Sequence, residues 1–268
     1  MSVPRDAAAL VVIATTAARA GARVHRDGLG RVHQVAAKSS ATDVVTEVDR
    51  EAERVIVDAI LAARPDDAVL GEEATRRDGT TGVRWIVDPL DGTTNYLYRY
   101  PAFAVSIGIE IDGALVAGLI HDSARERVYA GIVGAGATCD GVPIRPRDQA
   151  DLATALVATG FQPEPARRAW QAGVLARILP HVRDVRRGGA AAIDLACVAS
   201  GQLDAFYEAG LAEWDTAAGT AIARAAGAVV RTIARPAAPT PLVVAAAPRL
   251  VDALVTLLET AGALGVGP

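Results

Sequence analysis

The chain has 268 residues, of which 51% are hydrophobic and 22% are charged, and its formal net charge is −4. This composition is typical of a globular protein that buries a sizeable core, and it excludes a disordered chain or a membrane bundle. A charge so close to balance gives no general affinity for nucleic acid, which would need a clustered basic surface. We therefore expect neither a nucleic acid nor a membrane as partner.

The thiols and imidazoles show no metal-binding pattern. Cys139 and Cys197 have no CxxC partner, and the four histidines show no paired spacing. Free cysteines are typical of a reducing compartment, so we expect a cytoplasmic protein.

The first predicted element is a helix in the apolar run from Ala7 to Ala18, where Leu10 and Ile13 lie at helical spacing. A signal peptide is the alternative, because Arg5 precedes the run. Asp6 weakens such a charged start, and we favour a packed helix. No apolar run is expected to reach the length of a membrane span.

The only lysine among the 27 basic residues is Lys38, which lies in a polar stretch before the next predicted helix. A compact ammonium can approach phosphate or metal-bound water in a way that a guanidinium fork cannot. Lys38 is therefore a candidate accessory residue, with chance composition as the alternative.

The next elements predict helices packed on a largely antiparallel sheet. Thr46 and Asp49 resemble a capping box at the start of an amphipathic helix that ends before Pro65. The pair Asp112 and Gly113 predicts a hairpin turn. Strands are expected at Ala68–Leu70, Trp85–Val87, Phe103–Ile109, Ala114–Ile120 and Arg127–Gly131.

From about Asp151 strands and helices alternate, which predicts a mixed sheet covered by helices on both faces. The polar stretch from Pro143 to Asp151 favours a division into an α+β unit, residues 1–146, and an α/β unit, residues 147–268. Strands are expected at Ala155–Ala158, Val182–Val185, Asp204–Tyr207, Ala228–Val230 and Leu242–Ala245, and helices at Ala169–Leu179, Ala191–Ala199, Asp215–Ala226 and from Arg249.

Two aspartates follow an apolar strand directly. Since Pro89 lacks an N–H group and Gly92 favours a turn, we expect the strand to end before Asp88 and Asp91. Gly92 and the two threonines after it would form a tight turn whose N–H groups and hydroxyls hold phosphate oxygens. A solvated turn without function is the alternative interpretation.

Two further carboxylates have a similar placement. Glu72 follows the expected strand Ala68–Leu70, and Asp215 lies at the start of an expected helix. Taken singly, Glu72 could be a surface acid and Asp215 a helix cap. Four carboxylates at the ends of elements form an oxygen-rich site that suits hard cations, and the lack of thiolate or imidazole pairs argues against zinc.

At these residues the sequence resembles the inositol monophosphatase family. Its signatures are similar to the stretch from Asp88 to Tyr96 and to the stretch from Trp214 to Gly219. Three shorter matches occur in the same order, at Lys38-Ser39-Ser40, Thr46-Glu47-Val48-Asp49 and Gly71-Glu72-Glu73.

The resemblance implies an α+β phosphatase with a layered αβαβα fold that binds two or three Mg²⁺ ions. By motif position, one ion is held by Glu72, Asp88 and the Leu90 carbonyl. A second is held by Asp88, Asp91 and Asp215, and Glu72 shares a further ion. The implied catalytic residues are Glu72, Thr93 and Asp49, the last two of which orient the attacking water.

The resemblance also implies which residues contact the substrate. The phosphate would meet Gly92, Thr93 and Thr94, and the polyol would meet Gly189, Ala190, Ala191, Glu208 and Asp215. Arg187 matches a basic residue near the ligand in bacterial relatives, with a plain surface arginine as the alternative. Relatives often carry Ser or Thr where Ala190 stands, which leaves the preferred polyol open.

The implied function is Mg²⁺-dependent hydrolysis of a small phosphate monoester by a metal-activated water. The leading substrate, a phosphorylated polyol, is myo-inositol 1-phosphate. Histidinol phosphate, fructose 1,6-bisphosphate and adenosine bisphosphate are alternatives, since no motif here decides specificity. Some relatives act in RNA metabolism, so a non-catalytic partner protein is a second class of function. The resemblance further implies inhibition by lithium and a homodimer.

Overall fold

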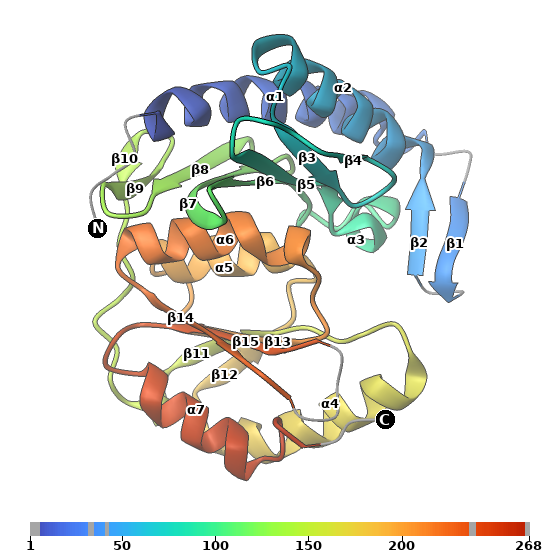
Figure 1. Ribbon diagram of the computed structural model, residues 1–268. Coiled ribbons are helices and arrows are strands. Elements are labelled where there is room, and N and C mark those ends of the chain that lie inside the picture. The colour runs from blue at the N-terminus through green and yellow to red at the C-terminus, as the bar shows by residue number, and fades with distance from the viewer. Residues whose placement is uncertain (1–5, 32–34, 41–42, 236–239, 266–268) are drawn as a thin grey trace.

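Five layers of secondary structure make up the protein (Figure 1). The computed structural model describes residues 6–31, 35–40, 43–235 and 240–265. Helices α1 (Ala7–Gly28) and α2 (Glu47–Ala63) cover one sheet, and α5 (Ala191–Ala199) and α6 (Glu213–Ala226) separate it from a second. Helices α4 (Pro165–Ile178) and α7 (Val251–Thr260) cover the outer face of that second sheet. The predicted αβαβα sandwich is confirmed.

The first sheet has eight strands in the order β10-β9-β8-β7-β6-β5-β3-β4. All neighbours are antiparallel except β3 and β5, so the predicted antiparallel character is confirmed. The strands are β3 (Ala68–Gly71), β4 (Arg76–Arg77), β5 (Val83–Asp91), β6 (Ala104–Ile111), β7 (Ala114–Asp122), β8 (Arg127–Ile132), β9 (Gly136–Cys139) and β10 (Val142–Pro143).

The second sheet is mixed, as predicted. Its order is β12-β11-β13-β15-β14, with β11 parallel to both its neighbours and the other pairs antiparallel. The strands are β11 (Leu156–Thr159), β12 (Asp184–Arg186), β13 (Ala205–Ala209), β14 (Val229–Ile233) and β15 (Leu242–Ala246). The division into units at residues 146 and 147 stays a prediction.

Helix α1 has 22 residues and is long and apolar enough for a membrane span by length and composition, so the expectation that no run reaches that length is wrong. Its apolar face packs against α2 and the first sheet, where Leu10, Ala14 and Ala17 are buried. This contact is the one predicted for a packed helix, because its apolar stripe is covered by protein.

A row of three glycines lets α6 lie directly on the first sheet. Gly108, Gly118 and Gly131 are register partners on β6, β7 and β8. A Cβ atom at Gly118 would lie 2.3 Å from the Ala218 carbonyl oxygen, and Cβ atoms at the other two would meet Ala217 and Ile222 at 2.5 and 2.8 Å. The absence of three side chains therefore sets how closely the helix approaches the sheet.

Local turn and cap signals are confirmed. Asp112 and Gly113 both have positive φ between β6 and β7, as a tight hairpin turn requires. The Thr46 side chain and Asp49 form the predicted capping box of α2.

The expectation that β5 stops before Asp88 is wrong. The strand continues through Pro89 to Asp91, and its register with β6 shifts between the two aspartates. Pro89 fits because the irregularity removes the need for its missing N–H group. The predicted tight turn after Asp91 is also wrong, since Gly92 precedes a short helix, α3 (Thr93–Leu97).

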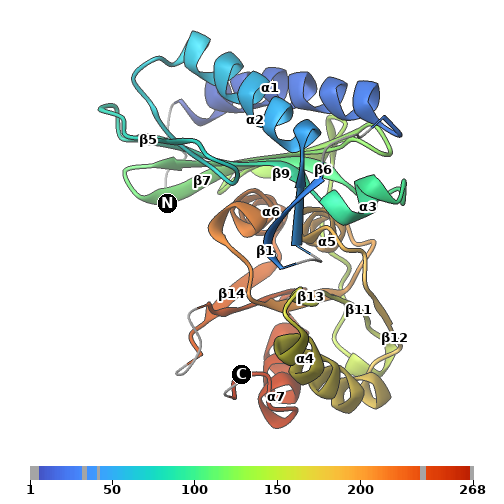
Figure 2. The same ribbon diagram turned by 90° about the vertical axis from the view of Figure 1, so that its right-hand side faces the viewer.

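A hairpin that the sequence did not predict precedes α2. Strands β1 (Val35–Ser40) and β2 (Asp43–Thr46) pair antiparallel and project from the start of α2 toward the middle helical layer (Figure 2). Lys38 lies on β1, and its side chain is outside the described residues.

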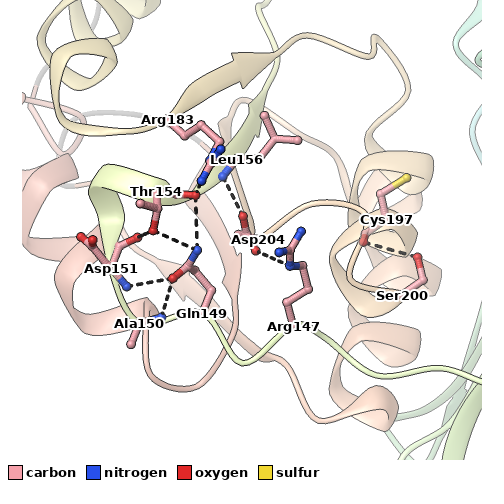
Figure 3. Close-up of polar contacts among 10 residues, drawn as sticks. All are labelled: Arg147, Gln149, Ala150, Asp151, Thr154, Leu156, Arg183, Cys197, Ser200 and Asp204. Atoms are coloured by element: carbon pink, nitrogen blue, oxygen red, sulfur yellow. Dashed lines mark hydrogen bonds and ion pairs between the residues drawn. The ribbon is translucent and has the colours of Figure 1, made fainter.

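Polar side chains anchor the segment that links the two sheets (Figure 3). The buried carboxylate of Asp204 accepts a hydrogen bond from the Leu156 backbone at 2.8 Å and lies 3.6 Å from the Arg147 guanidinium. Gln149 accepts from two backbone N–H groups and donates to the Thr154 carbonyl. The link is thereby tied to the start of β11 and to the segment before β13.

Candidate active site

The four predicted metal-binding carboxylates converge where β3, β5 and α6 meet. Glu72 follows β3, and Asp88 and Asp91 lie at the end of β5. Since β3 and β5 are parallel, their carboxyl ends share one edge of the sheet. Asp215, in the first turn of α6, completes the group, because the pKa of Asp88 responds to all three of the others.

Burial makes this cluster costly to charge. Asp88 is 2% exposed and Asp91 is 8% exposed. Burial, followed by the neighbouring Glu72 and the other acids, raises the pKa of Asp88 well above its usual 3.8. Burial likewise raises the pKa of Asp91 to about 7. The carboxylates therefore need a positive partner to be ionised together.

Asp91 also caps a helix from a distant part of the chain. Its Oδ2 accepts a hydrogen bond from the Ala192 N–H group at 2.7 Å, at the start of α5. Ala190, the N-cap of α5, has no side chain that could cap it. The aspartate therefore replaces the missing hydroxyl and fixes α5 beside the end of β5.

The turn that carries Glu72 is held by Glu53 of α2. This carboxylate is 4% exposed and accepts hydrogen bonds from the N–H groups of Glu73, Ala74 and Thr75 at 2.8 to 3.0 Å. It also accepts one from the Thr75 hydroxyl. Nothing in the local sequence marks Glu53, which faces the turn only after α2 packs on the sheet.

Thr93 and Asp49 form a hydrogen-bonded pair, although they are 44 residues apart. Thr93 Oγ1 lies 2.9 Å from Asp49 Oδ1 and 3.1 Å from the Leu90 carbonyl oxygen. Asp49 is fully buried, and burial raises its pKa. Its second oxygen accepts from the backbone N–H group of Thr46, so the carboxylate has one fixed orientation.

Gly92 and Asn95 shape the loop between β5 and α3. Gly92 has φ of +94°, and a Cβ atom there would lie 2.7 Å from the Ala102 carbonyl oxygen. The buried Asn95 donates from Nδ2 to that same carbonyl at 2.7 Å and to the Gly188 carbonyl at 2.9 Å. Asn95 thus ties α3 to the segment that precedes α5.

A buried histidine supports β5 from behind. His25 of α1 bonds through Nε2 to the Pro89 carbonyl and through Nδ1 to Ser123 Oγ, both at 2.9 Å. A carbonyl only accepts, so Nε2 carries the proton and Nδ1 accepts from Ser123. The His25 ring also packs against Tyr96 and Phe103.

A cavity of about 570 Å³ opens beside the carboxylates. Asp88, Leu90 and Asp49 are not among the residues that line it. Of the predicted site residues, it is lined by Glu72, Asp91, Gly92, Thr93, Thr94, Arg187, Gly189, Ala190, Ala191, Glu208 and Asp215. A single cavity therefore brings the expected phosphate and polyol residues together.

Two more buried carboxyls lie near each other: Glu208, which lines the cavity, and Asp194 of α5, which does not. Burial raises the pKa of Glu208 well above its usual 4.5, and burial raises the pKa of Asp194 to about 7. The guanidinium of Arg187 opposes both shifts. Arg187 is exposed and lines the cavity, and its role toward a ligand stays a prediction.

Five cavity residues were not predicted. None belongs to a recognisable motif. Four of them follow β11 or β13, which are neighbours in the sheet, and the fifth, Arg168, lies on α4. Gly160 lies directly against Glu208 in the structure, where a Cβ atom would come within 2.1 Å of that carboxylate, and no local sequence signal marks the contact. The five are Gly160, Phe161, Pro163, Arg168 and Leu211.

The donor set fits a hard divalent cation. Neither Asp88 nor Asp91 has an arginine or lysine ion-pair partner in the part of the chain that the structure describes. Buried carboxylates without such partners are typical of metal ligands. Among the same described residues, no three His, Cys, Asp or Glu side chains stand as a preformed cage.

Comparison with known proteins identifies the family. The model of the inositol monophosphatase family matches residues 6–262. An inositol-1-monophosphatase of Mycobacterium leprae is 46% identical over 236 residues, which cover 84% of this chain and 81% of that protein. The Nus factor SuhB of Escherichia coli K12 is 39% identical over 197 residues, with coverage of 73% and 74%.

A solved structure, the extragenic suppressor protein SuhB of Bartonella henselae, shares the fold with a TM-score of 0.88 and 32% identity over 96% of this chain and 100% of that one. The family match spans nearly the whole chain, and the relatives include proteins named as phosphatases. The chain belongs to the inositol monophosphatase family, which is generally metal-dependent, and is a phosphatase.

Proposed function

We propose that the protein hydrolyses a small phosphorylated polyol in the presence of Mg²⁺, with myo-inositol 1-phosphate as the leading substrate. The observation that carries the proposal is one cavity lined by the carboxylates of Glu72, Asp91 and Asp215 and also by Arg187 and Glu208, which are polar groups suited to an alcohol. Histidinol phosphate, fructose 1,6-bisphosphate and adenosine bisphosphate remain alternatives within the same chemistry.

Two or three Mg²⁺ ions would be held by Glu72, Asp88, Asp91, Asp215 and the Leu90 carbonyl. Bound there, the ions would make hydroxide available near neutral pH and neutralise the phosphoryl oxygens and the leaving alkoxide. Asp91 keeps its place because the α5 N–H group holds one of its oxygens.

The Thr93 and Asp49 pair would orient the attacking water. The Thr93 hydroxyl has one proton and lies near two acceptors, Asp49 and the Leu90 carbonyl. If the Leu90 carbonyl is a metal ligand, the hydroxyl would donate its hydrogen bond to Asp49. A lone pair of that hydroxyl would then accept a hydrogen bond from the attacking water. Asp49 can take up the proton that Thr93 passes on, because burial raises its pKa.

Substrate would lie across the cavity. The N–H groups at the start of α3, from Gly92 to Thr94, would receive the phosphate, since the first N–H groups of a helix have no intrahelical partner. Glu208 and Arg187 would hydrogen-bond the hydroxyls of the alcohol.

A phosphate-release assay tests the proposal. The esters named above are compared with Mg²⁺ present and after its removal by a chelator. We expect the highest kcat/KM for myo-inositol 1-phosphate and no release without the metal. No release from any phosphomonoester would contradict the proposed function.

The similarity to a Nus factor motivates a second candidate, a role as partner protein in RNA metabolism. A pull-down whose yield is unchanged by Asp91→Asn would favour it, because that variant alters only the site. We also propose a cytoplasmic homodimer; both cysteines are free thiols, as a reducing compartment requires.

A further inference from the structure

Two chain segments form the walls at the alcohol end of the cavity. Residues 160–163 follow β11, and residues 208–211 include the end of β13. The ladder between β11 and β13 ends at the pair Thr159 and Tyr207. The two walls therefore extend past the last backbone pairing that joins their strands.

One side chain of helix α4 joins both walls. Gln171 Oε1 accepts a hydrogen bond from the Gln162 N–H group at 2.7 Å, and its Nε2 donates to the Ala209 carbonyl at 3.1 Å. Gly160 and Glu208 line the cavity, and they also line a smaller one that Gln171 borders. Gln171 thus lies directly behind the cavity surface.

The position of Gln171 in α4 is unusual for an amide. It shares the buried face of the helix with Val174 and Ile178 and is 8% exposed. A polar side chain at a core position costs free energy unless it is hydrogen-bonded. Both ends of the amide are used, one on each wall, which explains why glutamine occupies a site that suits an apolar residue.

Arg168, which also lines the cavity, restrains the first wall through its guanidinium. Its Nε donates to the Gln162 carbonyl at 3.2 Å and its Nη2 to the Pro163 carbonyl at 3.0 Å. The Gln162 side chain in turn packs against Gly210, where a Cβ atom would lie 2.4 Å from it. The first wall is therefore held by α4 on one side and by the second wall on the other.

We propose that Gln171 and Arg168 are positioning residues that set the separation of the two walls and thereby select the alcohol half of the substrate. This inference rests on the proposed function. The phosphate end depends on α3 and on the start of α5, which neither residue contacts. A change in either residue should therefore alter binding of a bulky alcohol and leave the phosphate end unchanged.

Gln171→Met tests the first residue, since it keeps the length of the side chain and loses both hydrogen bonds. The full chain is assayed with myo-inositol 1-phosphate and with the small ester glycerol 2-phosphate. We expect KM for the inositol ester to rise about fivefold, the effect of one net hydrogen bond. We expect kcat for both esters, KM for the small ester and inhibition by inorganic phosphate to be unchanged.

Arg168→Met provides an independent test, because this side chain is exposed and its loss does not threaten folding. Arg167→Met is the matched control on the same helix, with no side-chain hydrogen bond to the wall. Three outcomes would overturn this inference but not the proposed function. They are an equal change in KM for both esters, no change in either KM, and an effect of Arg167→Met as large as that of Arg168→Met. Absence of hydrolysis by the unaltered protein would overturn the proposed function and this inference with it.

Discussion

His25 should make the stability of the protein unusually sensitive to mild acid. Burial, only partly offset by the hydrogen bond to Pro89, lowers its pKa from 6.5 to about 3. Below pH 6.5 the unfolded chain binds a proton at this residue, whereas the folded protein does not until about pH 3. The stabilisation is therefore complete above pH 6.5 and is lost as the pH falls from 6.5 toward 3.

The magnitude follows from the two pKa values. Between pH 7 and pH 5 the loss is about 2 kcal/mol, since one pKa unit corresponds to about 1.4 kcal/mol and the unfolded chain is protonated over most of that range. The free energy of unfolding changes in the opposite direction for three buried carboxyls, because a raised pKa makes the folded state bind protons first as the pH falls. These are Asp91, Asp194 and Glu208. Those groups are the same in a His25 variant and cancel in a comparison.

The assay is urea denaturation of the unaltered protein and of His25→Gln at both pH values. The glutamine amide can donate to the Pro89 carbonyl and accept from Ser123, but it does not titrate. We expect the free energy of unfolding to fall by about 2 kcal/mol more in the unaltered protein. An equal fall in both proteins would refute the assignment of His25 as a buried neutral imidazole.

Other predictions concern the site itself. Asp91→Asn should keep the fold, because an amide oxygen still accepts the hydrogen bond from Ala192. It should reduce phosphate release by on the order of 100-fold or more, since an amide is a poor Mg²⁺ ligand. Near-normal rates would contradict the metal site. Thr93→Val should lower kcat by about 100-fold or more with KM unchanged, and an unaltered kcat would exclude its role with water. Glu53→Ala should cost about 3 kcal/mol in urea denaturation and raise the Mg²⁺ requirement, because it frees the turn at Glu72; unchanged values would argue against that anchor. Lithium should inhibit at millimolar concentration, and insensitivity would count against the second ion.

Local signals in the sequence were reliable where one short segment decides the structure. Asp112 and Gly113 form a turn by themselves, and the capping box from Thr46 to Asp49 spans only four residues. The end of β5 was mispredicted because Pro89 is accepted only where the strand shifts its register and His25 binds the carbonyl. Those conditions come from α1 and β6, which the local pattern does not contain.

The carboxylates of the candidate site were predictable because they belong to recognisable motifs. The residues that hold them were not. Glu53 reads as one acid among many on a helix, and Gln171 reads as an ordinary polar residue, until each is seen against the backbone groups that it bonds. Leu211 reaches the cavity only through the order of strands in a sheet, which no local pattern encodes.

The row of glycines under α6 has a consequence for how such sites diversify. Asp215 travels with this helix, whereas Asp88 is fixed to the sheet below it. A methyl group at Gly108 or Gly118 would collide with α6 and push this helix away from the sheet, which would increase the distance between the two carboxylates. The distance between these two carboxylates thus depends on glycine positions that are not themselves metal ligands. A substitution at those positions could change the spacing of a metal site in a homologue without replacing any ligand.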